Sequence, residues 1–233
     1  MDQRMLFKRL AVTLLLGAWA AGSLSALNEA EERCAKAAET LEEILSAPDK
    51  GVPQDLFSKA HCVVIVPGMI KGGFIVGGKY GRGVISCRGP QGKGWTGPTS
   101  VRMEGGSVGF QIGGSKTDLL LLVMNQHGKS NLLESKFTLG GDASVAAGPV
   151  GRTANAQTDA QMQAEILAYS RSQGVFAGIS LEGATLRPDP KQDEELYGKR
   201  VDRFAVLDGK VPVPQGAQVL VDTLTKYSTQ EHR

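Results

Sequence analysis

The feature that most constrains the fold is the distribution of glycine between residues 68 and 114. The chain has 30 glycines in 233 residues, roughly twice the usual share of about 7%. In this region they interrupt β-forming segments, as in VVIVPGMIKGGFIVGGKYGRGVISCR and GGSVGFQIGG. Glycine inside a strand pattern marks bulges, tight bends or close backbone approach. The region therefore predicts a strongly bent antiparallel sheet or half-barrel.

N-terminal, middle and C-terminal helices are predicted to flank this sheet, which makes the fold class α+β. Residues 28–46 carry apolar side chains at helical spacing, and Asn28 stands where an N-cap is needed. The run LLLLV within residues 118–124 predicts a strand buried on both faces. The remaining predicted elements are short helices at residues 53–60, 126–134 and 189–197, strands at 164–171 and 175–181, a turn at 187–190 and a final helix at 215–227.

The first 26 residues read as a signal peptide, followed by a single domain at residues 27–233. Arg4, Lys8 and Arg9 precede a short apolar run and small residues, which is the pattern of an export signal. No cysteine follows where a lipoprotein signal needs one, so we expect a periplasmic or secreted protein with neither a lipid anchor nor a transmembrane segment. Removing the segment reduces the formal net charge of +2 to zero, which argues against a nucleic-acid partner.

The three cysteines are Cys34, Cys62 and Cys87. An exported protein meets an oxidising compartment, but an odd number allows at most one internal disulfide. A bond between Cys34 and Cys62 is one interpretation. The alternative is that all three are small buried hydrophobic residues.

Two short motifs have the letters of catalytic or nucleotide sites but not their context. Ser107 lies in a G-x-S-x-G sequence, which in hydrolases needs a helix directly after the serine, whereas strand-like residues follow here. The G-x-G-x-x-G sequence at residues 92–97 has no helix after it to receive a pyrophosphate. Histidines and cysteines are dispersed singly, without the close pairs of a metal site. The sequence predicts neither a cofactor nor a metal, and a serine hydrolase is a remote alternative.

Basic and aromatic residues gather around the glycine-rich segment. Such a set can hold a phosphate head group while a ring lies at the membrane interface; the alternative is ordinary solvated charge on a sheet edge. In a regular strand Lys79 and Arg82 point to opposite faces, so they converge only if a bulge or turn near Gly81 intervenes. The candidate lipid-binding residues are Lys71, Lys79, Tyr80, Arg82, Lys93, Trp95 and Arg152.

Five long stretches of the chain carry specific motifs: IVPGMIKGGFIVGGKYGRGV, GWTGPTSV, GGSVGFQIGGSKTDLLLLVMN, KFTLGGDASVAAGPVGR and AEILAYSRSQGVFAGISLEGATLRPD. Together they cover most of residues 65–189. These stretches resemble the SYLF domain family. The resemblance implies a compact domain of sheet and helices without cofactor or catalytic centre. It also implies lipid binding and, as in some eukaryotic members, association with actin.

The chain departs from the eukaryotic members in one respect. Those members look like phosphoinositide binders that use a basic surface and an N-terminal amphipathic helix. Residues 28–46 instead hold six glutamates against Arg33 and Lys36, so an anionic surface repels this helix. The main prediction is an exported bacterial member that binds lipid or a membrane surface without catalysis, with phospholipid or phosphoinositide head groups as the candidate ligands. The alternative is a protein-interaction domain of the actin-binding kind.

Overall fold

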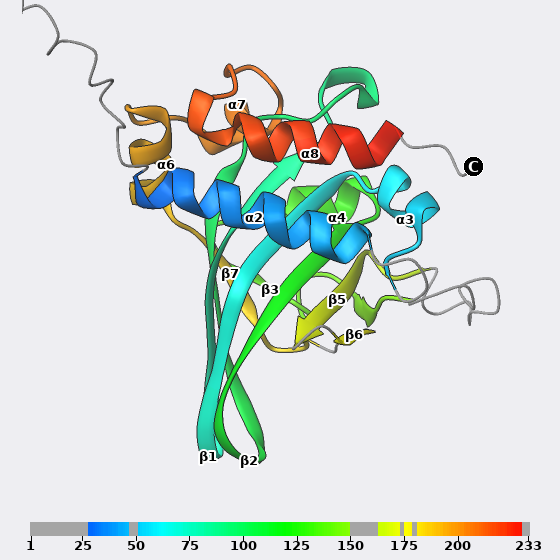
Figure 1. Cartoon of the computed structure of the whole chain (residues 1–233), viewed down its shortest axis with the longest axis vertical. Coiled ribbons are helices and arrows are strands. Elements are labelled where there is room, and N and C mark those ends of the chain that lie inside the picture. Colours follow the sequence, from blue (N-terminus) through cyan, green and yellow to red (C-terminus); the bar gives the residue numbers. More distant parts are fainter. Residues whose placement is uncertain (1–27, 47–50, 150–162, 173–174, 179–180, 230–233) are drawn as a thin grey trace, which may run out of the picture.

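The computed structural model describes residues 28–46, 51–149, 163–172, 175–178 and 181–229. Figure 1 shows a curled sheet with helices gathered at one end and a long two-stranded ribbon extending away from them. The elements run in the order α2 (Glu29–Leu45), α3 (Gln54–Lys59), β1 (Cys62–Cys87), η1 (Pro90–Gly92), β2 (Thr99–Val123), α4 (Gln126–Leu132), β3 (Phe137–Thr138), β4 (Val145–Ala147), β5 (Ile166–Ser172), β6 (Val175–Gly178), β7 (Thr185–Pro188), α6 (Pro190–Tyr197), α7 (Arg203–Leu207), η3 (Gln215–Ala217) and α8 (Gln218–Thr229).

The two long strands form one antiparallel ribbon that folds back on itself. β1 and β2 pair from Cys62 with Val123 to Ile85 with Thr99. A Cβ on Gly81 would meet the side chains of Val66 and Met69. Because these residues belong to the same strand as Gly81, β1 must reverse direction between them. The glycines thus allow the close approach that the sequence predicted.

The sheet curls because different parts of β2 pair with different neighbours. Residues 101–104 of β2 pair with β7, whereas residues 118–123 pair with β5. Among the described residues the sheet has seven strands, and β1 and β6 lie off its main path. The predicted α+β class and bent, half-barrel sheet are confirmed. The sheet is not wholly antiparallel, however, since β4 pairs with β5 in parallel.

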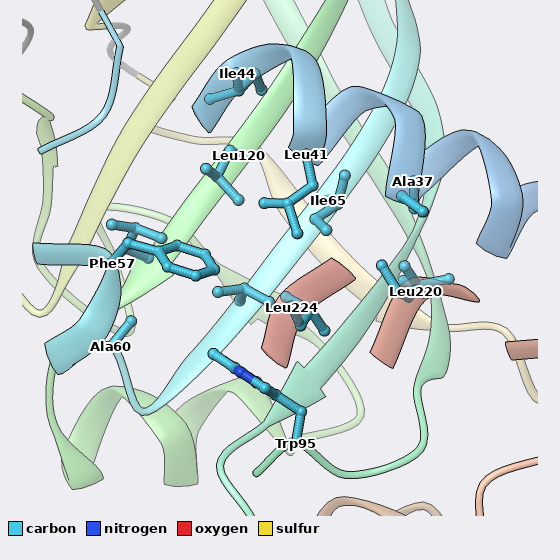
Figure 2. Close-up of a cluster of buried hydrophobic side chains, with 14 of the residues drawn as sticks. Ala37, Leu41, Ile44, Phe57, Ala60, Ile65, Trp95, Leu120, Leu220 and Leu224 are labelled. Atoms are coloured by element: carbon cyan, nitrogen blue, oxygen red, sulfur yellow. The ribbon is translucent and has the colours of Figure 1, made fainter. Parts of the chain in front are cut away.

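Alternation along the central strands produces two hydrophobic clusters, one on each face of the sheet. Ile65 and Leu120 face the helices, and Figure 2 shows them in one cluster with Leu41 of α2 and Leu224 of α8. Val64 and Leu121 face the inside of the curled sheet. All five side chains from Leu119 to Val123 are fully buried, so the prediction of a strand buried on both faces is confirmed.

Helix α2 begins as predicted, at a capping box. The Asn28 side chain accepts a hydrogen bond from the Glu31 backbone N–H (2.8 Å), and the Glu31 carboxylate accepts one from the Asn28 N–H (3.1 Å). These bonds satisfy two backbone donors that the first turn of a helix otherwise leaves free. They fix the start of α2 over the sheet.

The predicted bond between Cys34 and Cys62 is wrong. The disulfide joins Cys62 to Cys87, while Cys34 is a free, buried cysteine on α2. The fold-back of β1 brings the two ends of this one strand together, and burial raises the pKa of the Cys34 thiol to about 12. Cys34 therefore behaves as a small hydrophobic residue, as the alternative interpretation held for it.

The turn predicted at residues 187–190 is also wrong in part. Residues 185–188 form β7, which pairs with β2 on one side and with β3 on the other. Pro188 is tolerated because it is the last residue of the strand. The predicted signal peptide at residues 1–26 lies outside the described residues, so it stays a prediction.

Candidate functional site

The folded-back ribbon carries the candidate site on an arm that projects from the body of the domain. We define the arm as residues 70–80 of β1 and the paired residues 104–116 of β2. Figure 1 shows its tip at the end of the molecule away from the helices. The sequence of the tip, GGFIVGG in β1 and GGSVGFQIGG in β2, contains no ionisable residue. The charges of the arm therefore lie between its tip and the core.

Lys71 and Lys79 lie close together on the inner face of the arm. Side chains two residues apart in a strand point to the same face. Lys71 is two residues from Met69, and Lys79 is two residues from Gly81. Met69 contacts Gly81 inside the folded-back strand. Burial and the neighbouring charge of Lys79 lower the pKa of Lys71. Across the described part of the chain, neither ammonium group has a carboxylate within ion-pair distance. Two unpaired, partly desolvated cations make a site that favours an anion.

The outer face of the arm combines apolar and charged side chains, since the acidic Glu104 pairs with Tyr80 across the ribbon. Ile70 is 51% exposed and Tyr80 is 44% exposed. Ile70 pairs across the ribbon with the exposed Lys116, and partners across an antiparallel pair share a face. The sequence interpretation did not single out Ile70 or Lys116. Only the register of the ribbon identifies them, because it pairs two residues that are more than forty positions apart along the chain.

Arg82 does not join the lysines. The ribbon has no register shift between Gly77 and Ile85, so the bulge needed for convergence with Lys79 is absent from this stretch. Arg82 donates hydrogen bonds to Tyr80 Oη (3.0 Å) and to Glu29 Oε1 (2.8 Å), and its Nε lies 3.8 Å from Asp189. Arg82 thus links the arm to the start of α2. Because its guanidinium already has these hydrogen-bond and charged partners, few donors remain for a lipid head group.

Trp95 and Lys93 lie in the loop between β1 and β2, far from the tip. Trp95 is only 6% exposed, and Figure 2 shows its ring in the helix-side cluster with Phe57 and Leu224. Its indole N–H donates to Ser228 Oγ (3.2 Å). An interfacial anchor must reach the lipid, so the predicted role of Trp95 does not fit. Lys93 is exposed at this same loop, and the predicted contact at Arg152 lies outside the described residues.

The G-x-S-x-G motif occupies continuous strand. Ser107 pairs with Gly77 in the middle of β2, which continues to Val123. A nucleophile elbow needs a sharp turn into a helix at the serine, so this backbone cannot form one. The G-x-G-x-x-G motif likewise precedes β2 and not a helix.

The described residues give no sign of a metal centre or of a membrane-spanning helix. They contain no group of three or more histidine, cysteine, aspartate or glutamate side chains placed to share an ion. None of the helices in the same part of the chain has both the length and the apolar character needed to cross a bilayer.

A buried acid of α6 holds the start of β2. Asp193 of α6 accepts a hydrogen bond from the Ser100 backbone N–H (2.5 Å) at the start of β2. Burial raises the pKa of Asp193 to about 6, although the bonds from Ser100 and the charge of Arg203 oppose the rise. The folded state therefore holds a proton on Asp193 at pH values where the unfolded chain, with a pKa near 3.8, has released it.

This difference predicts a pH dependence of stability. Since the folded pKa is raised, ionisation of Asp193 destabilises the fold progressively as the pH rises from about 4 to about 6. In Asp193→Asn the side-chain oxygen can still accept from Ser100, but the ionisation is lost. We expect the free energy of unfolding of the variant, relative to that of the unsubstituted protein, to increase by about 2–3 kcal/mol between pH 4 and pH 7. Urea unfolding across this range measures the difference, and a difference that does not change with pH contradicts the prediction.

The chain is similar in sequence to one protein family and to several known proteins. A family model described as "Ysc84: Las17-binding protein actin regulator" matches residues 104–227. SH3 domain-containing YSC84-like protein 1 of Rattus norvegicus is 32% identical over 216 residues, which are 90% of this chain and 63% of the rat protein. Protein YSC84 of Saccharomyces cerevisiae is 32% identical over 179 residues, 76% of this chain and 38% of the yeast protein. The chain thus spans less than two thirds of the length of these relatives.

The matches and the fold agree with the resemblance found in the sequence. The matched region includes most of β2 and the described elements that follow it, as far as residue 227 of α8. This family is one of binding and actin-regulatory domains and is not known as an enzyme family. The chain therefore belongs to the Ysc84 family of SYLF domains.

Proposed function

We propose that the domain binds the surface of an anionic membrane through its arm. The observation that carries the proposal is the unpaired lysine pair, Lys71 and Lys79, directly below an uncharged tip. Ile70 and Tyr80 add exposed apolar surface on the opposite face of the same ribbon. An uncharged tip can enter the head-group region while the ammonium groups stay at the level of the phosphates.

The energetics favour a phosphate between the two lysines. Partial burial and the neighbouring charge of Lys79 disfavour the charged form of Lys71 in the free protein. A phosphate group relieves both costs, because it supplies negative charge and hydrogen-bond acceptors at once. Each basic residue near an anionic surface contributes about 1 kcal/mol. The formally neutral domain thus needs a local site of this kind.

The proposal predicts that Lys71→Gln with Lys79→Gln weakens binding to anionic vesicles by about 10- to 30-fold, since two such contributions are lost. Co-sedimentation with phosphatidylcholine vesicles with and without phosphatidylglycerol, at low and high salt, measures the affinity. The matched control is Lys191→Gln with Lys199→Gln, two exposed lysines on and just after α6. Equal losses in the two double variants, or no binding by the unsubstituted protein, would overturn the proposal.

A second candidate function is the binding of a protein partner. It is favoured by the descriptions of the family and its relatives, which name Las17 binding and actin regulation. A groove of about 470 Å³ between α2 and the base of the arm offers a place, since Ile70 lines it together with acidic and basic side chains. Co-sedimentation with filamentous actin in the absence of lipid tests this candidate. Ile70→Ser should weaken such binding, whereas Lys71→Gln with Lys79→Gln should leave it unchanged.

We also propose that the protein works in an oxidising compartment after export. The Cys62–Cys87 disulfide supports this, because such bonds persist in exported proteins and are rare in reducing compartments. Fractionation of cells that produce the full chain, with the thiol state determined in each fraction, tests it. Recovery of the protein with reduced Cys62 and Cys87 in the cytoplasmic fraction alone would contradict the proposal.

A further inference from the structure

A second basic site lies at the end of the domain opposite the arm. A pocket of about 390 Å³ opens there between α3, the two ends of β1 and the start of α4. Its polar lining side chains are Ser58, Lys59, His61, Arg88, Gln126 and Lys129, and within the described part of the chain no carboxylate lines it. A concave surface with basic walls and no lining acid concentrates positive potential.

Arg88 is held rigidly in the wall of this pocket. Its guanidinium donates to the backbone carbonyl oxygens of Ser58 (2.9 Å), Ala60 (3.3 Å) and Phe57 (3.4 Å), and its centre lies 4.1 Å from the Trp95 ring centroid. These contacts use Nε and Nη2, whereas Nη1 takes part in none of the hydrogen bonds between described residues. Burial lowers the pKa of Arg88, but a guanidinium keeps its charge at any physiological pH.

The covalent framework fixes the two walls that carry His61 and Arg88. These residues directly precede Cys62 and follow Cys87, which form the disulfide. The Arg88 backbone N–H also donates to the His61 carbonyl oxygen (2.8 Å). The basic side chains therefore start from backbone positions that are set before a ligand arrives, which lowers the entropy lost on binding.

The two lysines of the pocket are only weakly engaged elsewhere. Lys59 Nζ lies 3.9 Å from Asp55 and Lys129 Nζ lies 3.7 Å from Asp208, both near the outer limit for an ion pair. Such contacts contribute about 0–1 kcal/mol each. Either ammonium group can turn toward an anion in the pocket at little cost.

We propose that this pocket binds a small organic molecule that carries an oxyanion, either phosphate or carboxylate. The volume of about 390 Å³ falls within the range of small-molecule sites, about 300–1,000 Å³, and exceeds what a bare ion needs. Arg88 supplies a planar donor for the oxyanion, the lysines supply charge, and Ser58 and Gln126 supply hydrogen bonds to the rest of the ligand. The pocket is separate from the arm and does not depend on the function proposed for it.

Calorimetric titration of the oxidised domain with pyrophosphate, and separately with citrate, tests the proposal at low salt. We expect saturable binding of at least one probe. Lys59→Gln with Lys129→Gln should weaken that binding at least tenfold, whereas the matched control Lys191→Gln with Lys199→Gln, which removes the same charge outside the pocket, should bind as the unsubstituted protein does. Amide chemical shifts should change at His61, Gly89 and Gly92 on addition of the probe.

Two further measurements separate the sources of the oxyanion and the two proposed sites. Vesicles containing phosphatidic acid should displace the bound probe if the natural ligand is a lipid head group, and should leave it bound if the ligand is a free solute. The arm variant Lys71→Gln with Lys79→Gln should bind the probe normally. The proposal is overturned if neither probe binds saturably, if both lysine double variants lose binding equally, or if the shift changes map to the arm.

Discussion

Replacing Cys62 and Cys87 together with alanine is expected to lower the free energy of unfolding by about 3–4 kcal/mol. The disulfide closes a loop with a sequence separation of 25, and a cross-link of that span removes about this much conformational entropy from the unfolded chain. Both cysteines are fully buried in the inner cluster, so loss of the sulfur atoms adds to the effect. Urea unfolding under oxidising conditions measures the change.

The free cysteine offers the control for this experiment. Cys34→Ala keeps the disulfide and removes one buried sulfur, so it should cost no more than about 1 kcal/mol. Because Cys34 is buried with a raised pKa, a thiol reagent should find no reactive group in the native protein and one after unfolding. Three reactive thiols after unfolding without reductant, or equal losses of stability in the two variants, would contradict the assigned bond.

Gly83→Ala should destabilise the domain by about 3 kcal/mol. A Cβ at this position would collide with the backbone carbonyl oxygen of Ile65 and with Val66. Backbone atoms cannot move aside as the end of a flexible side chain can, and overpacking of a tight contact costs about 1–3 kcal/mol or more. The substitution forces apart the two halves of β1, on which the curl of the sheet depends.

Gly78→Ala in the same strand is the matched control for Gly83→Ala. A Cβ at Gly78 would meet no atom within 4 Å, so the change in stability should stay within about 0.5 kcal/mol. Thermal and urea unfolding of the two variants compare the positions directly. If Gly83→Ala proves as stable as Gly78→Ala, the halves of β1 do not pack as described.

The elements that the sequence predicted correctly are those whose signals are local. The helical spacing of residues 28–46 and the capping position of Asn28 lie within one helix. The buried run that ends at Val123 is equally self-contained. The glycine pattern also predicted a bend, because a glycine pair affects the conformation of the backbone around it and needs no distant partner to do so. Propensity and periodicity are properties of short windows, so these predictions needed no knowledge of the tertiary fold.

The errors concern contacts that only the folded chain creates. Cys62 meets Cys87 because β1 reverses direction, and no local signal distinguishes that pairing from one with Cys34. The strand β7 has only four residues, and its pairing with β2 defines it. Trp95 is buried through contact with α8, whose Ser228 follows it by 133 positions. Such long-range partners decide burial and pairing, and a single sequence does not contain them explicitly.

In the candidate site, too, local signals predicted some features and long-range contacts decided the others. Lys71 and Lys79 were both predicted as contacts, and the structure brings them together because the bend lies between them. The alternation rule correctly stated that Lys79 and Arg82 diverge unless a bulge intervenes. It could not show that Arg82 is held by Glu29, because that contact depends on how α2 lies over the sheet.

The order of pairing along the β1–β2 ribbon has a consequence for how the chain folds. Ile85 and Thr99 are the nearest paired residues in sequence, while Cys62 and Val123 are the most distant. Loop closure costs less entropy for near neighbours, so we expect the hairpin to nucleate beside the Trp95 loop and to zip toward the chain positions that are farthest apart. Cys62 and Cys87 then meet only after the ribbon has folded back on itself. Formation of the disulfide is therefore expected to be a late step that stabilises a fold the chain has already adopted.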